Sequence, residues 1–108
     1  MSSQSAHYDV FQAVADHNRR KIIGMLADNE MAITAIAAQF PITRTAVNKH
    51  LHVLTAAGLL YKRKVGRETR FKLRPAPLYE IQQWVAFYER YWEDNLNALK
   101  AFVENDQE

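Results

Sequence analysis

Two helical patterns separated by one proline constrain the fold of this chain more than any other feature. Apolar residues recur at helical spacing over residues 33–40, and Pro41 cannot continue that helix because its ring removes a backbone donor. Thr43 provides an N-cap for a further helix, which we expect to run to Ala57. Gly58 is expected to end it, because glycine adopts a left-handed conformation without penalty. Helix, short break and capped helix is the arrangement of a helix-turn-helix.

The segments on both sides of this unit define the rest of the architecture. Residues 59–74, which we call the wing, alternate apolar and charged side chains on either side of Gly66, and this predicts a β-hairpin. Short helices are predicted over residues 8–15 and 19–27, and one uninterrupted helix over residues 78–103, which contain no Gly or Pro. The expected fold is mainly α with a small β-hairpin, a winged helix-turn-helix of order α-α-α-α-β-β-α in a single domain.

Composition argues against several classes of protein. The chain has no cysteine, which excludes a disulfide framework and a thiolate metal site. No apolar run is long enough for a membrane span, and the start of the chain lacks the features of a signal peptide, so we expect a cytoplasmic protein without a membrane partner. Glycine occurs only at positions 24, 58 and 66, and no paired carboxylates lie in an apolar setting. We therefore predict neither an enzyme nor a cofactor.

Charge is distributed unevenly along the chain, whose formal net charge is +2. Residues 1–75 hold 12 Lys and Arg against 5 Asp and Glu, whereas residues 76–108 hold 2 against 7. A basic body followed by an acidic segment favours a polyanionic partner for the first part.

The helix after Pro41 has one apolar and one polar face. At about 100° per residue, Val47, Leu51 and Leu54 fall on one stripe, which must face the core. The opposite side is polar throughout, and each of its side chains can bond a base edge or a phosphate. We predict that this face contacts DNA through Arg44, Thr45, Asn48, Lys49 and His52. His50 lies at the flank of the buried stripe, where packing or a phosphate contact is expected.

The wing is the second predicted DNA-binding element. Half of all Lys and Arg fall between residues 62 and 74, with Glu68 as the only acid there, and so dense a group of cations repels itself unless a polyanion lies beside it. We expect DNA contacts from Lys62, Lys64, Arg67 and Arg70, with Arg67 at the tip reaching a minor groove. The alternative is a hairpin whose cations only keep an edge strand from aggregating, but its position after the helix-turn-helix favours DNA.

The predicted last helix carries an apolar stripe rich in Trp and Tyr, at spacings that alternate between three and four residues. Such aromatic residues are enriched at interface hot spots. We expect a two-fold homodimer whose interface, formed by the first and last helices, includes Tyr8, Phe11, Trp84, Tyr88, Tyr91, Trp92, Leu96 and Leu99. The alternative is that the stripe packs only within its own chain. A two-fold dimer places two recognition helices one DNA turn apart on a palindromic site.

A resemblance to the ArsR family of winged-helix repressors, also called ArsR/SmtB, is carried by the segment TRTAVNKHLHVLTAAGLLYKRKVGRETRFKL. The family's pattern of A-V-S-[KR]-H-L, a spaced Leu, A-G-L-[LV] and a basic wing is matched there, with Asn48 in the Ser position. Upstream, the chain resembles the family's opening in NRRKIIGMLADNEMAITAIAAQF, and its aromatic final helix resembles the metal-independent branch. The resemblance covers about residues 9–103. It implies a dimeric repressor that leaves its operator when an effector binds.

Many members of that family sense metals, but the ligand positions differ here. The family's Cys-x-Cys pair would fall on Ala32 and Thr34, neither of which binds a soft metal. Its second site requires Asp, His and Glu on the last helix, and residues 78–108 contain no His. His50 and His52 lie two apart on a helix, so they diverge and cannot share an ion. We therefore predict no metal site.

These features together predict a sequence-specific DNA-binding transcriptional regulator, a homodimeric repressor on a palindromic operator, and leave its effector open. One alternative is a winged-helix module used for protein–protein interaction, which exposed aromatics on the recognition helix would favour. Another is RNA binding, which would need exposed aromatics on the sheet, where only Tyr61 and Phe71 could serve.

Overall fold

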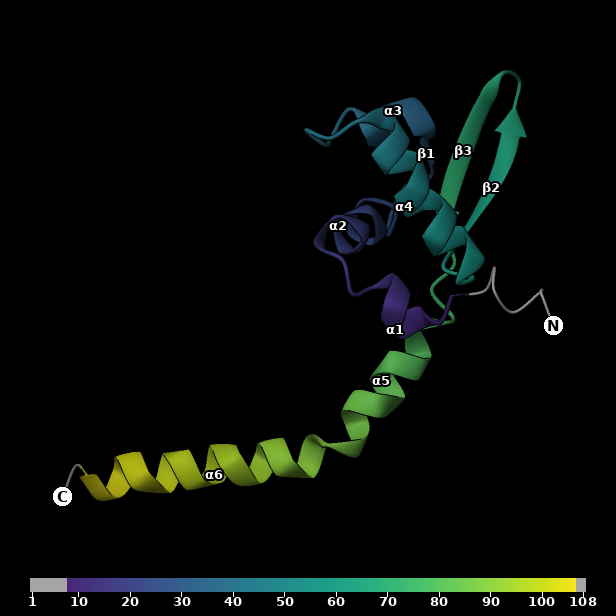
Figure 1. Ribbon diagram of the computed structural model, residues 1–108. Helices are drawn as coiled ribbons and strands as arrows, with labels where there is room; N and C mark the ends of the chain where they lie inside the picture. Colours follow the sequence, from purple (N-terminus) through teal and green to yellow (C-terminus); the bar gives the residue numbers. More distant parts are fainter. Residues whose placement is uncertain (1–7, 107–108) are drawn as a thin grey trace.

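The computed structural model describes residues 8–106, and its elements follow the order of a winged helix-turn-helix, which confirms the predicted fold class (Figure 1). The first four helices and a small sheet form the body, and the last two helices extend away from it. In chain order the elements are α1 (Val10–Ala13), α2 (His17–Met25), β1 (Met31–Ala32), α3 (Ile33–Ala37), α4 (Arg44–Ala56), β2 (Leu60–Val65), β3 (Glu68–Leu73), α5 (Leu78–Phe87) and α6 (Glu89–Asp106).

The core lies beneath α4, as the spacing of its apolar residues predicts. Val47 and Leu54 are fully buried and Leu51 is 2 % exposed. The other buried residues of this cluster come from α1, α2, α3, the sheet and the segments between them: Val10, Ala13, Ile22, Leu26, Ile36, Phe40, Leu59, Leu60 and Phe71. Because one stripe of α4 is buried, the rotation of the helix is fixed and its opposite face is turned to solvent.

Both ends of α4 are fixed by local backbone chemistry. The Thr43 hydroxyl accepts a hydrogen bond of 3.1 Å from the Ala46 N–H, which is the predicted N-cap. At the other end the Leu59 N–H donates to the Leu54 carbonyl, and Gly58 has the left-handed φ of +81° that this type of helix end requires. The start and end of α4 are therefore set by the residues from which they were predicted.

The sheet is antiparallel with the strand order β1-β3-β2. Strands β2 and β3 form the predicted hairpin, in register from the pair Leu60–Leu73 to the pair Val65–Glu68. The two-residue turn between them needs a positive φ at its first position, and Gly66 has a φ of +63°. Strand β1 was not predicted, because its two residues are too few to show an alternating pattern.

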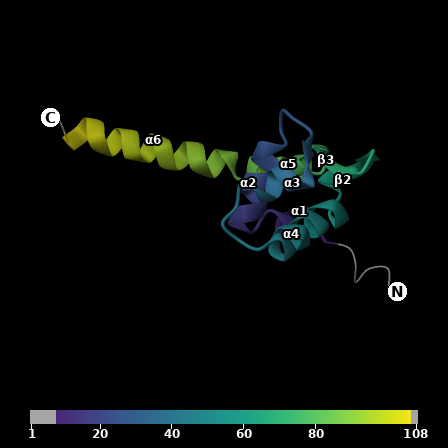
Figure 2. The same ribbon diagram turned by 90° about the horizontal axis from the view of Figure 1, so that it is seen from above.

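The prediction of one continuous last helix is wrong. The helix breaks at Tyr88, whose φ of −100° and ψ of 4° leave the helical region, and α6 then runs in a different direction from α5 (Figures 1 and 2). The N–H groups of Tyr88 and Tyr91 each bond the carbonyl three residues earlier, which tightens the turn. The rings of Trp84, Phe87 and Tyr91 all pack on the Tyr88 ring at this break. None of the helices described here is long and apolar enough to cross a membrane.

Candidate nucleic-acid interface

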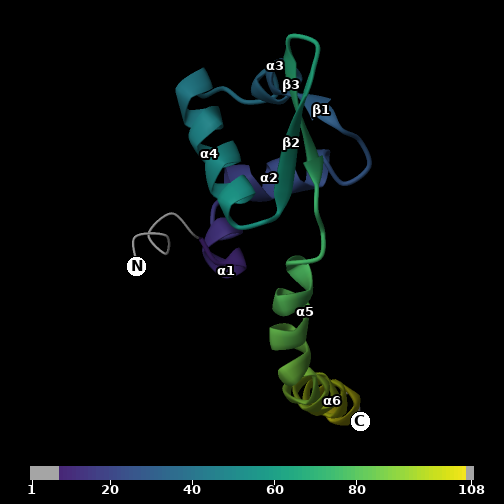
Figure 3. The ribbon, with the colours of Figure 1, turned by 90° about the vertical axis from the view of Figure 1, so that its right-hand side faces the viewer.

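The five residues predicted to contact DNA from α4 are all exposed on its outer face: Arg44, Thr45, Asn48, Lys49 and His52. The wing stands beside this helix, and α4 packs against β2 (Figure 3). A hollow of about 250 Å³ lies between the two elements and is lined by Asn48 and His52 from α4 and by Lys62 and Thr69 from the wing. Part of the outer face of α4 and one face of the wing therefore border a common groove.

The strand register divides the wing's cations between its two faces. Lys62 is opposite Phe71 and Lys64 is opposite Thr69, and residues paired across strands share a face. Because Phe71 is buried in the core beneath α4, Lys62 and Lys64 lie on the face turned toward α4. The structure thus brings these two predicted residues to the same side of the wing as the recognition helix.

Arg67 occupies the second position of the tight turn and is exposed at the wing tip. It lines a hollow of about 390 Å³ together with Arg44 from the first turn of α4, Thr34 from α3 and one acid, Glu68 from β3. One cation from the recognition helix and one from the wing therefore face the same space. This arrangement suits a phosphate chain that passes from one element to the other.

Arg70 is separated from the other predicted wing residues. It is opposite Arg63 in the register and so lies on the face turned away from α4. Its Nη1 is 3.6 Å from Glu30 Oε1, and its Nε donates to Glu68 at 3.1 Å. The structure therefore places Arg70 in an ion-pair cluster outside the groove.

No role is predicted for Glu30 from the sequence. The Glu30 carboxylate accepts two hydrogen bonds from Arg63, of 2.8 and 2.9 Å. The hydrogen bond from Arg63, together with the charges of Arg63 and Arg70, holds the pKa of the Glu30 carboxyl below its usual range. The two partners are 33 residues apart in sequence, so no local pattern could have paired them.

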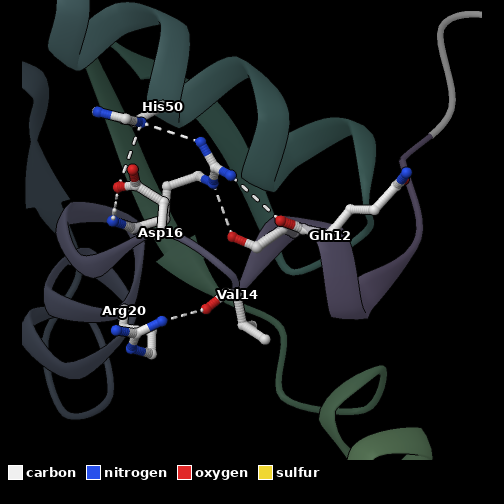
Figure 4. Close-up of polar contacts among 7 residues, drawn as sticks. Gln12, Val14, Asp16, Arg20 and His50 are labelled. Carbon is white, nitrogen blue, oxygen red and sulfur yellow. Dashed lines mark hydrogen bonds and ion pairs between the residues drawn. The ribbon is translucent and has the colours of Figure 1, made fainter.

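His50 makes contacts within the chain, which is one of the two roles that its flanking position predicts. Its Nδ1 is 3.3 Å from Arg19 Nη1 and 3.9 Å from the Asp16 carboxylate (Figure 4). Arg19 also donates to the carbonyls of Gln12 and Ala13 at the end of α1, so it joins α1 and α2 to α4. Desolvation raises the pKa of Asp16, but the hydrogen bond from the Arg19 N–H and the nearby charges of His50 and Arg19 outweigh it, and the net pKa is lowered.

The residues predicted for a dimer interface fall into two groups. Phe11 of α1 and Trp84 of α5 pack edge to face, with ring centroids 5.7 Å apart, and are continuous with the aromatic residues around Tyr88. Six of the predicted residues are 37–64 % exposed on α5, on α6 and at the break between them: Trp84, Tyr88, Tyr91, Trp92, Leu96 and Leu99. Tyr8 lies elsewhere, at a hollow of about 370 Å³ lined by Thr45, Asn48, Lys49, His52 and Val53 of α4. Tyr8 therefore borders the outer face of the recognition helix.

The positions of the family's cysteine ligands lie at the junction of β1 and α3. Ala32 is the last residue of β1 and is almost buried, whereas Thr34 is exposed in the first turn of α3. Within residues 8–106, no three His, Cys, Asp or Glu side chains come together as a metal site. The side chains at the two ligand positions offer a methyl group and a hydroxyl, which do not fit a soft metal ion.

Proteins of known function resemble the chain over most of its length. The family described as "Helix-turn-helix domain" matches residues 14–63. The HTH-type transcriptional regulator Rv2034 of Mycobacterium tuberculosis is 29% identical over 106 residues, which cover 98% of this chain and 96% of that protein. The transcriptional repressor SdpR of Bacillus subtilis is 29% identical over 77 residues, which cover 71% of this chain and 86% of SdpR.

Solved structures of other proteins resemble this chain in both fold and sequence. An ArsR-like transcriptional regulator from Rhodococcus sp. RHA1 is 30% identical with a TM-score of 0.69, and the match covers 96% of this chain and 93% of that one. A possible transcriptional regulator for arsenical resistance is 35% identical with a TM-score of 0.68, over 87% and 95% of the two chains. The chain therefore belongs to the ArsR family of winged helix-turn-helix transcriptional regulators, which bind DNA and are not enzymes, and its metal-ligand positions hold other residues.

Proposed function

We propose that the protein is a homodimeric repressor that binds a palindromic operator, with one half-site for each protomer. The groove between α4 and the wing is the feature that supports the DNA contacts. The outer face of α4 carries donors and acceptors for base edges in Asn48 and Arg44, and cations for phosphates in Lys49 and in Lys62 and Lys64 of the wing. The recognition helix α4 contains no Phe, Tyr or Trp, and the large exposed aromatics lie on α5 and α6, at Tyr88 between them and at Tyr61 of β2.

Homodimer formation is supported by the amount of surface that one chain leaves exposed. A folded monomer of 12.5 kDa exposes about 6,200 Å², whereas this chain alone exposes 8042 Å². Its radius of gyration is 19.2 Å, against about 13 Å for a compact domain of this length. The excess of about 1,800 Å² per protomer is of the size that permanent dimers bury.

The chemistry of that excess surface favours a second copy as the partner. Trp92, Leu96 and Leu99 are each more than half exposed, and they follow one another at helical spacing on α6. Phe11 lies in contact with Trp84, so α1 contributes to the same apolar surface. In this single domain of 108 residues the two ends of the fold, α1 and α5–α6, would then form the dimer interface. Dimers with two-fold symmetry present two identical DNA-reading helices, which match a palindromic site.

Repression, as opposed to activation, is supported by relatives. Proteins named as repressors include SdpR of Bacillus subtilis and the arsenical resistance operon repressor of Escherichia coli, which is 26% identical over 98 residues. A repressor needs only to occupy its operator. The groove between α4 and the wing supplies that occupancy without a further domain.

The proposal is tested by selecting bound sites from random duplex DNA and then determining the mass of the complex by sedimentation. We expect an inverted repeat with half-sites about one DNA turn apart, bound by two chains. A reporter gene placed behind the selected site should be expressed less when the protein is present. Selection of a single half-site, or of no preferred sequence at all, would contradict the proposal.

A further inference from the structure

We propose that Glu30 is a positioning residue for DNA binding, because it anchors the far face of the wing to the body of the protein. In this arrangement Arg63 and Arg70 hold the hairpin in place, and Lys62, Lys64 and Arg67 remain for DNA. The inference rests on the proposed DNA-binding function. Cations that alternate along β2 and β3 therefore have different roles: those on one face of the wing anchor it, and those on the other face bind DNA.

The geometry of the contact is that of a two-pronged ion pair. Glu30 Oε2 accepts from Arg63 Nε at 2.8 Å, and Glu30 Oε1 accepts from Arg63 Nη2 at 2.9 Å. Two parallel hydrogen bonds between a guanidinium and a carboxylate fix orientation as well as distance. Arg70 Nη1, at 3.6 Å from Glu30 Oε1, adds a second cation to the same carboxylate.

The sheet topology makes this contact a bridge across all three strands. Glu30 immediately precedes β1, and Arg63 lies on β2 at the opposite edge of the sheet. Ala32, Arg70 and Arg63 are register partners in one row, so the Glu30 side chain reaches past β3 to β2 on that face. The bridge therefore connects the loop after α2 to the middle of the outer strand of the wing.

The wing needs such support because little else holds its outer half. Strand β1 pairs only with Phe71 and Arg70, and beyond them β2 and β3 form a two-stranded ribbon whose residues 64–68 are all exposed. A two-stranded hairpin without a packed face is marginally stable in water. Arg63 and Arg70 also lie directly opposite each other, and like charges in that position repel. Glu30 lies between them and removes the repulsion.

The environment of Glu30 fits a structural role. Its side chain is 17% exposed, while that of Arg63 is 61% exposed, so the bridge is open to solvent on the arginine side. The Arg63 hydrogen bond lowers the pKa of the Glu30 carboxyl, which is therefore ionised at neutral pH. An acidic residue so close to a DNA-binding wing works against phosphate binding, unless it serves the position of the wing.

The direction in which one substitution changes the affinity for DNA distinguishes a positioning role of Glu30 from a purely electrostatic effect of its charge. Glu30→Gln removes a negative charge near the DNA, and electrostatics alone predicts tighter binding. A positioning role predicts the opposite, because the amide cannot replace both ionic hydrogen bonds to Arg63. Glu68→Gln is the matched control. It removes the same charge from the wing tip and breaks only the bond to Arg70.

The experiment measures the affinity of each variant for a duplex selected with the wild-type protein, by fluorescence anisotropy. We expect Glu30→Gln to bind several-fold more weakly than wild type, and Glu68→Gln to bind at least as well as wild type. The single variants Glu30→Gln and Arg63→Gln and the double variant form a double-mutant cycle. The double variant should lose clearly less affinity than the sum of the losses in the two single variants, because the two residues act as a pair. Equal or tighter binding by Glu30→Gln would overturn the inference.

Amide hydrogen exchange without DNA provides a readout that does not depend on the proposed function. Exchange at residues 61–65 should be faster in Glu30→Gln than in wild type, while exchange in the core of α4 stays unchanged. Unchanged exchange in β2 would overturn the bridge itself. If the wild-type protein selects no DNA sequence but exchange in β2 responds as expected, the proposed function fails and the bridge stands.

Discussion

Replacement of Arg67 at the wing tip should reduce both the affinity for DNA and its dependence on salt. Binding to duplex DNA releases counterions, and the logarithm of the affinity falls with the logarithm of the salt concentration by about 0.9 per neutralised phosphate. The proposed DNA-binding surface has five cations per protomer: Arg44, Lys49, Lys62, Lys64 and Arg67. A dimer that used all of them would have a slope of about −9. Arg67→Ala removes two of these contacts per dimer, so the slope should become shallower by about 1.8.

The assay is a titration of a labelled operator by fluorescence anisotropy at a series of salt concentrations. Lys100→Ala is the matched control, because it removes the same charge from an exposed position on α6, outside the groove. Its slope should equal that of the wild type. If Arg67→Ala and Lys100→Ala give the same slope, Arg67 does not contact phosphate and the placement of the wing tip on DNA is wrong.

Three further variants and one change of condition test other parts of the structure. Lys49→Ala should weaken operator binding while its thermal unfolding stays at the wild-type temperature; unchanged affinity would remove Lys49 from the interface. Trp92→Glu should yield monomers in sedimentation equilibrium, because it places a charge in an apolar interface; an intact dimer would refute that interface. Gly58→Ala should lower the free energy of unfolding in urea by about 1–2 kcal/mol, because an L-residue is strained at a φ of +81°. The added Cβ would lie 3.7 Å from Pro77, an ordinary contact, so the strain comes from the backbone alone. An unchanged midpoint would contradict this. The pKa values of Glu30 and Asp16 are lowered in the fold, so the stability that these carboxylates contribute is present above their ordinary pKa values and is lost as the pH falls through the lowered ones. The urea midpoint should therefore drop between about pH 5 and pH 3, and it should drop less in Glu30→Gln. An equal drop in that variant would exclude Glu30 as a source of the pH dependence.

The parts of the fold that could be predicted are those encoded by neighbouring residues. Pro41, Thr43 and Gly58 each act on the backbone within a few residues, and together they set both ends of α4. The apolar spacing within α4 is equally local and correctly identified which side of the helix is buried. The hairpin followed from alternation around Gly66. These signals need no knowledge of the rest of the chain.

The parts that could not be predicted depend on residues far apart or on a balance without a local marker. Glu30 and Arg63 meet only because β1 joins the edge of the hairpin, and β1 is too short to recognise. The break at Tyr88 occurs without Pro or Gly, among aromatic rings that pack on one another across the turn. Tyr8 precedes α1 and borders the outer face of α4, and the helical spacing of the apolar residues could not indicate this contact.

The division of the wing's cations changes the reason for expecting DNA beside it. From the sequence, seven cations against Glu68 repel one another and call for a polyanion as a group. In the structure, Glu30 and Glu68 already balance Arg63 and Arg70, and the Arg74 guanidinium lies 5.3 Å from the centre of the Tyr61 ring. Lys72, on the same face as Arg63 and Arg70, has no ion pair among the described residues, so wing cations without an acidic partner lie on both faces and at the tip.

On the face turned toward α4 and at the tip, Lys62, Lys64 and Arg67 have no ion pair within residues 8–106, whereas Arg63 and Arg70 on the far face pair with Glu30 and Glu68. Of these three, Lys62 and Arg67 line hollows that residues of α4 also line, whereas Lys72 lies on the far face of the wing. The case for DNA thus depends on where the unbalanced cations lie more than on how many there are.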